Sequence, residues 1–133
     1  MKTAKELYPK FDGWFESDYQ PMLNEFGKII LQVDMQNYQG DSWLLYQDGE
    51  KIGYLNYGWG SCSGCDALQA CTTFGEIQGL MNDLRDDVKW FDNKQEALKY
   101  FLEHDHKGDY AWSYTEYKEF LVKAIELLSE DKR

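Results

Sequence analysis

The chain has 133 residues, of which 43% are hydrophobic and 17% aromatic. This composition is enough to bury a core without disulfides or metals. Its 24 acidic and 14 basic side chains leave a net charge of −10. Because phosphate backbones and anionic membranes are bound through clustered Lys and Arg, this charge argues against nucleic acid and membrane surfaces as partners. A basic protein partner is compatible with it.

The sequence predicts a single domain over residues 1–133 and a cytoplasmic location. No apolar run reaches the about 18 residues of a transmembrane helix. Residues 1–9 contain no apolar stretch like that of a signal peptide. In a reducing cytoplasm the three cysteines are expected as thiols, metal ligands or redox-active groups, and not as structural disulfides.

The N-terminal part of the chain is predicted to contain a short helix and an aromatic segment. Thr3 is placed to cap a helix over residues 4–8, which Pro9 would end. Residues 9–27 are expected to form an aromatic loop or short helical turns.

Three strand-like segments follow in close succession. Residues 28–35 alternate apolar side chains with period two over most of their length, as a half-buried strand does. Residues 43–47 and 51–57 flank Asp48-Gly49, a strong signal for a short hairpin turn. Because the second strand is apolar on both sides, both faces of the resulting sheet are expected to be covered.

Helical periodicity replaces this alternation after residue 65. A short helix is predicted from Asp66 to Cys71. Thr73 and Glu76 then form a capping-box pattern ahead of a helix over residues 74–89.

Two further helices are expected, one beginning at Asp92 and one at Ser113 or Thr115. Strands over residues 28–57 followed by helices predict an α+β fold, in which the helices pack on a small antiparallel sheet of three strands.

The segment Gly58-Trp-Gly-Ser-Cys-Ser-Gly-Cys-Asp66 lies where the strand pattern gives way to the helical one. Within it, Cys62 and Cys65 form a C-x-x-C motif. This spacing suits two metal-ligating thiolates, and it equally suits a dithiol that cycles to a disulfide. A third interpretation is that the cysteines are small buried hydrophobic groups.

A zinc site would need more ligands than the motif supplies. Cys71 is one candidate, although on a continuous helix it would lie about 240° around from Cys65. It could join only if the chain after Cys65 is irregular. His104 and His106 form an H-x-H pair in a predicted loop and are the candidates for the missing ligands.

Gly58, Gly60 and Gly64 come close to a dinucleotide-binding fingerprint. That fingerprint requires a second parallel strand after the helix, and the pattern here continues as helix instead. The predicted role of these glycines is therefore a backbone turn with positive φ, whose N–H groups form an anion-binding nest.

Aromatic side chains are concentrated on the predicted sheet and just after it. Trp43, Tyr54, Tyr57 and Trp59 are candidates for a protein contact surface, because aromatic residues are enriched at binding hot spots. The alternative for each is a place in the core.

Residues 57–68 resemble a segment of small uncharacterised proteins from bacteriophages and bacterial genomes. Those proteins share a G-x-G-S-C-S-G-C-D-x-L core after a short strand and a Trp-Phe pair further on, as in Trp90-Phe91 here. The resemblance implies a phage or prophage accessory protein, located in the host cytoplasm. Such proteins often act by binding a host factor.

The sequence therefore favours a non-enzymatic inhibitor or adaptor that binds a host protein, since no complete catalytic constellation is visible. The alternative is a zinc or thiol-redox site centred on Cys62 and Cys65.

Overall fold

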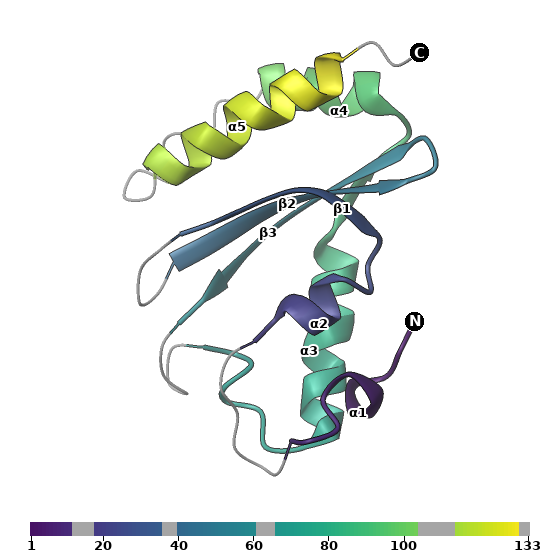
Figure 1. The fold of residues 1–133 in the computed structure, drawn as a ribbon, viewed down its shortest axis with the longest axis vertical. Helices are drawn as coiled ribbons and strands as arrows, with labels where there is room; N and C mark the ends of the chain where they lie inside the picture. The colour runs from purple at the N-terminus through teal and green to yellow at the C-terminus, as the bar shows by residue number, and fades with distance from the viewer. Residues whose placement is uncertain (12–17, 36–39, 61–65, 104–113, 131–133) are drawn as a thin grey trace.

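The computed structural model describes residues 1–11, 18–35, 40–60, 66–103 and 114–130 (Figure 1). The order of elements is α1 (Ala4–Leu7), α2 (Gln20–Leu23), β1 (Lys28–Asp34), β2 (Gly40–Asp48), β3 (Lys51–Trp59), α3 (Phe74–Asp87), β4 (Lys89–Phe91), α4 (Lys94–Glu103) and α5 (Tyr114–Ser129).

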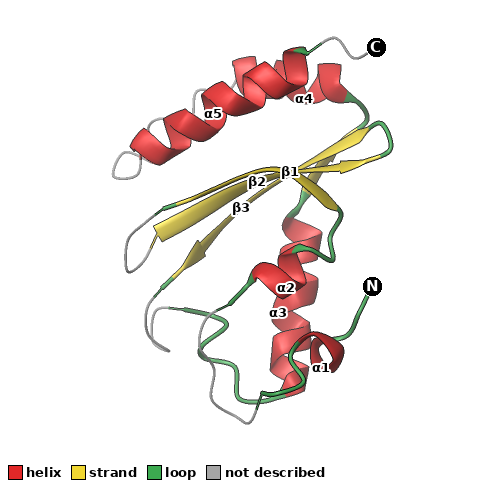
Figure 2. Cartoon of the chain, viewed as in Figure 1, coloured by secondary structure: helices red, strands yellow, loops and turns green. Residues whose placement is uncertain are grey.

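The strands form one antiparallel sheet in the order β1-β2-β3-β4. Helices α4 and α5 lie over one face, and α1, α2 and α3 lie on the other (Figures 1 and 2). The predicted α+β class with helices following an antiparallel sheet is confirmed. The expected number of three strands is wrong, because β4 adds a fourth.

The central hairpin forms at the predicted turn. Asp48 pairs with Lys51, and the register continues to Gly40 opposite Trp59, two residues beyond the predicted end of the strand. Gly49, the first loop residue, has φ +62°, a conformation that glycine adopts without steric cost.

The fourth strand depends on a glycine in β3. Gly53 pairs with Trp90, and a Cβ at position 53 would lie 2.8 Å from Val88 Cγ1 and 3.0 Å from Trp90 Cζ3. Only a residue without a side chain lets the chain after α3 approach this closely. Residues 88 and 89 are predicted as the end of a helix. In the structure Val88 follows the last residue of α3, and Lys89 is the first residue of β4.

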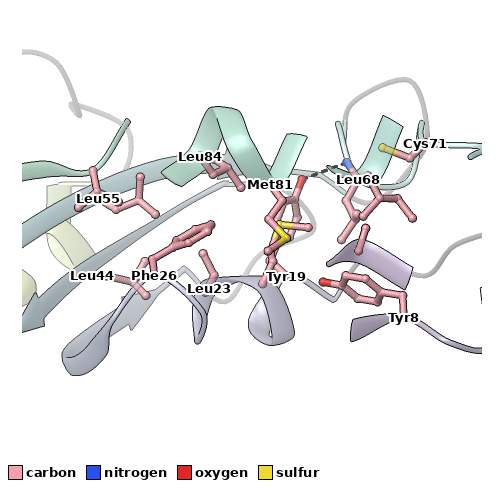
Figure 3. Close-up of a cluster of buried hydrophobic side chains, with 14 of the residues drawn as sticks. Tyr8, Tyr19, Leu23, Phe26, Leu44, Leu55, Leu68, Cys71, Met81 and Leu84 are labelled. Carbon is pink, nitrogen blue, oxygen red and sulfur yellow. Dashed lines mark hydrogen bonds between the residues drawn. The ribbon is translucent and has the colours of Figure 1, made fainter. Parts of the chain in front are cut away.

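Each face of β2 supports its own core, as its two-sided apolar pattern predicts. Leu44 and Tyr46 point to the face that carries α1, α2 and α3 (Figure 3). Trp43 and Leu45 point to the face that carries α4 and α5. All four side chains are fully buried, so the alternation of a strand places successive residues in opposite cores.

Capping side chains mark the starts of α1 and α3. Thr3 forms a full capping box with Glu6 ahead of α1. Thr73 caps α3 by accepting from Glu76 N at 3.1 Å. The carboxylate of Glu76, however, accepts from the backbone of Thr72 at 2.6 Å, one residue earlier than a capping box requires.

One predicted helix does not form, and another begins later than predicted. Residues 67–70 form a hydrogen-bonded turn and not a helix. Helix α4 begins at Lys94 and not at Asp92, because Asn93 Oδ1 accepts from Glu96 N at 2.9 Å and caps it. In the described ranges, no helix has both the length and the apolar character needed to cross a bilayer.

Candidate functional site

Most of the predicted metal or thiol site lies outside the described residues. This holds for Cys62, Gly64, Cys65, His104 and His106. Their roles as ligands or thiols stay predictions. Over the described ranges, no group of three or more His, Cys, Asp or Glu side chains is arranged to hold a metal ion.

Cys71 is described, and its surroundings do not activate it. The side chain is buried, with 6% of its surface exposed, and Sγ donates to the carbonyl of Ala67 at 3.4 Å. Burial raises the pKa of the thiol, and the carboxylates of Glu76 and Asp66 raise it further. A reactive thiolate needs the opposite environment.

Asp66, predicted as the start of a short helix, makes several hydrogen bonds with described residues on both sides of the motif. It is 3% exposed. Its Oδ1 accepts from Gly60 N at 2.8 Å and from Tyr19 Oη at 3.1 Å, and its Oδ2 accepts from Gln69 N at 2.9 Å. The carboxylate therefore joins the end of β3, the start of α2 and the turn at 67–70. It also holds together the two ends of the segment that contains Cys62 and Cys65.

Of the three glycines in the predicted nest, Gly58 and Gly60 are described. The N–H of Gly60 donates to the protein's own Asp66 at 2.8 Å. The expectation of positive φ at Gly58 is wrong, because this residue keeps the strand conformation of β3, which continues through Trp59. The nest itself stays a prediction.

The four candidate contact aromatics fall into two groups. Trp43 is fully buried and Tyr54 is 8% exposed; both pack in the core under α4 and α5. The prediction that Trp43 and Tyr54 belong to a contact surface is therefore wrong. Both side chains lie in the core, because they point to the face that α4 and α5 cover. Tyr57 and Trp59 are partly exposed, and both line a pocket.

This pocket has a volume of about 320 Å³. It lies on the α2 side of the sheet, where β2 begins and β3 ends. Its described lining residues come from four separate parts of the chain: Asp18, Tyr19, Gln20, Gln32, Asp34, Ser42, Tyr57, Trp59 and Gly60.

One wall of the pocket is a network of amides and carboxylates. Gln20 and Gln32 bind each other reciprocally, each amide nitrogen lying 3.0 Å from the other's oxygen. Gln32 Nε2 also donates to both oxygens of Asp34, at 3.1 and 3.2 Å. Asp18 Oδ1 accepts from the backbone N–H of Gln20 at 3.2 Å. The orientations of both carboxylates are thus held by hydrogen bonds from neighbouring amides.

The rest of the lining is largely aromatic. The rings of Tyr19 and Tyr57 lie 4.8 Å apart between centroids. Trp59 is fixed by a 2.9 Å bond from Nε1 to Oγ of Ser42, which is itself 1% exposed. These contacts orient the rings before any ligand is present.

Three carboxylates lie near enough to Tyr57 to act on its phenol. Burial is the largest cause that raises the pKa of this phenol, the bond with Ser42 opposes it, and the charges of Asp34, Asp66 and Asp18 raise the pKa further. Carboxylates that disfavour a negative charge at this position would favour a positive one.

The residues of the polar wall were not predicted from the sequence. A signal was present in β1, where the polar residues Gln32 and Asp34 alternate with the apolar residues Leu31 and Val33. Asp18 and Gln20 gave no local signal, because the aromatic residues around them dominate that segment.

No family model matches this chain, and searches of curated proteins and of solved structures give no match either.

Proposed function

We propose that this protein is a non-enzymatic binding module that recognises a basic segment of a partner protein at the pocket beside Trp59. The observation that carries the proposal is the composition of the pocket. Its nine described lining residues include two aspartates and three aromatic rings but no Lys or Arg. Carboxylates attract a cationic side chain electrostatically, and aromatic faces attract it by cation–π interaction.

The charge of the whole chain supports the same class of partner. A net charge of −10 attracts a basic surface from a distance and raises the association rate, an effect that salt screens. The aromatic side chains Tyr57 and Trp59 then add contact area at the pocket, as aromatic residues do at binding hot spots.

The resemblance of residues 57–68 to phage and bacterial proteins extends this proposal. The partner would be a host protein, and the chain would act on it as an inhibitor or adaptor. This part rests on the resemblance alone.

Binding of the full-length protein to three fluorescent peptides of equal length tests the proposal. The peptides are basic, neutral and acidic, and anisotropy is measured at low and high ionic strength. We expect the basic peptide alone to bind, with an affinity that falls as salt rises. Equal binding of the basic and neutral peptides, or none by either, would overturn the proposal.

The second candidate function is a zinc or thiol-redox site centred on Cys62 and Cys65, and the hydrogen bond between Asp66 and Gly60 supports it. This bond holds the two ends of their segment together, and a closed segment brings paired thiols towards one ion or one another. Native mass spectrometry of protein purified without chelator, before and after thiol alkylation, tests this. A bound zinc that alkylation removes supports a metal site. A metal-free protein whose Cys62 and Cys65 both alkylate slowly contradicts both forms of this candidate.

A further inference from the structure

We propose that the pocket binds the guanidinium group of an arginine in the partner's basic segment. This inference rests on the proposed function and narrows it to one side chain. It follows from how the hydrogen-bond donors around the pocket are used, from the facing aromatic rings and from the size of the cavity.

The amide donors of the polar wall are used within the protein. Gln20 Nε2 donates to Gln32 and to Asn24, and Gln32 Nε2 donates to Gln20 and to Asp34. Each amide nitrogen carries two hydrogens, so these bonds use both. The wall consequently presents acceptor groups, among which the carboxylate of Asp34 has a fixed orientation.

Three donors elsewhere in the lining are used in the same way. Tyr19 Oη and Gly60 N donate to Asp66, and Trp59 Nε1 donates to Ser42. A pocket in which these donors serve internal partners and two side chains are carboxylates is poorly matched to an anion. It is well matched to a ligand that only donates.

Guanidinium is such a ligand, because it carries five N–H donors and no acceptor. Its N–H groups form charge-assisted hydrogen bonds with carboxylates, of which the lining has two, those of Asp18 and Asp34. Its flat face stacks on aromatic rings such as Trp59 and Tyr57. An ammonium group is compact and more strongly hydrated, so lysine would use the carboxylates but gain less from the rings.

The dimensions of the pocket agree with a single side chain. Its volume of about 320 Å³ is at the lower end of the range of ligand sites, roughly 300–1,000 Å³. A bare metal ion fits the described lining less well, because it includes only two carboxylates, those of Asp18 and Asp34.

The test uses capped tripeptides Gly-X-Gly, where X is arginine, lysine or citrulline, titrated into the full-length protein by NMR. Citrulline keeps the shape of arginine and removes its charge. We expect arginine to bind best and citrulline to bind at least about tenfold more weakly, since charge-assisted bonds are the strong ones. Equal affinities for arginine and citrulline, or for arginine and lysine, would overturn the inference.

Two matched variants locate the binding. Asp34→Asn removes one charge from the pocket, and Asp83→Asn removes one from an exposed position of α3 outside the lining. We expect Asp34→Asn to weaken arginine binding about tenfold and Asp83→Asn to leave it unchanged. Asp18→Asn, at an exposed position, serves as a second pocket variant should Asp34→Asn fail to fold. Equal effects of the pocket and control variants would contradict the inference.

The two proposals fail in different ways. If the long basic peptide binds but the tripeptides do not discriminate arginine from citrulline, the arginine pocket is wrong and the binding module stands. If the long basic peptide does not bind, both are wrong.

Discussion

Tyr19 and Asp66 are 47 residues apart in the chain, and the hydroxyl of Tyr19 donates to Oδ1 of Asp66 at 3.1 Å. The same hydroxyl accepts from Leu68 N at 3.2 Å, a bond drawn in Figure 3. This pair ties α2 to the turn that follows the cysteine motif, and Tyr19 also lines the pocket together with Tyr57 and Trp59.

Replacing Asp66 is expected to destabilise the protein strongly. Asp66→Ala removes three hydrogen bonds to a buried carboxylate and leaves the N–H of Gly60 without its partner. We expect a loss of about 2–4 kcal/mol in the free energy of unfolding. Urea denaturation measures it, with the exposed Asp83→Ala as control, which should change stability by less than about 0.5 kcal/mol. Equal stabilities of the two variants would show that the carboxylate does not organise this region.

Two glycine substitutions are expected to have opposite effects. Gly53→Ala places a methyl group 2.8 Å from Val88 Cγ1 and should cost about 1–3 kcal/mol by overpacking. Gly79→Ala adds a methyl group to an exposed position of α3 with no atom within 4 Å, and should stabilise the helix by about 0.5–1 kcal/mol.

Thermal unfolding of both glycine variants is the measurement. A Gly53→Ala protein as stable as the wild type would contradict the close approach of β4 to β3.

Alkaline pH is expected to unfold the protein. Burial is the largest cause that raises the pKa of the phenols of Tyr8, Tyr19, Tyr46 and Tyr57 above their ordinary value near 10. Above pH 10 the folded state therefore holds more protons than the unfolded chain. The stability that these four phenols contribute is complete below pH 10 and is lost as the pH rises above it.

Tyrosinate absorbance followed against far-UV circular dichroism tests this prediction. We expect at least these four of the ten tyrosines to ionise only as secondary structure is lost. Complete ionisation of all tyrosines in a protein that is still folded would contradict it.

Cys71 is expected to resist alkylation in the native protein. Its thiol is buried and its pKa is raised, so both access and thiolate fraction are reduced. Iodoacetamide treatment followed by peptide mass spectrometry should show slow modification at neutral pH and rapid modification in denaturant. Rapid native modification would show that the turn at 67–70 opens readily.

Local patterns predicted the elements whose signals lie close together in the sequence. The Asp48-Gly49 hairpin, the Thr73 cap and the two-sided burial of the second strand are all present. Strand β4 was missed because it has three residues and directly follows a helix. Its pairing depends on Gly53, far away in the chain, and periodicity carries no information about that contact.

The candidate site was harder to predict for the same reason. Trp59 and Tyr57 were selected from their residue type and line the pocket. Asp34 joins them through the strand register, because it lies opposite Ser42 and Ser42 lies opposite Tyr57. Asp18 joins them through the position of the segment that leads into α2. Trp43 and Tyr54 have the same residue types but point to the other face. Whether an aromatic residue lies in the core or lines the pocket depends on the face of the sheet to which it points. Residue type does not specify that face; the register of the strands does.

The most direct measurement of the central claim is the chemical shift of the Trp59 indole N–H during titration with the arginine tripeptide. That proton lies in the pocket and binds Ser42. We predict a saturable shift in the wild type and in Asp83→Asn, which needs about tenfold more peptide in Asp34→Asn and at least about tenfold more with the citrulline tripeptide. An unmoved Trp59 signal, with shifts only elsewhere in the protein, would contradict an arginine pocket at this site.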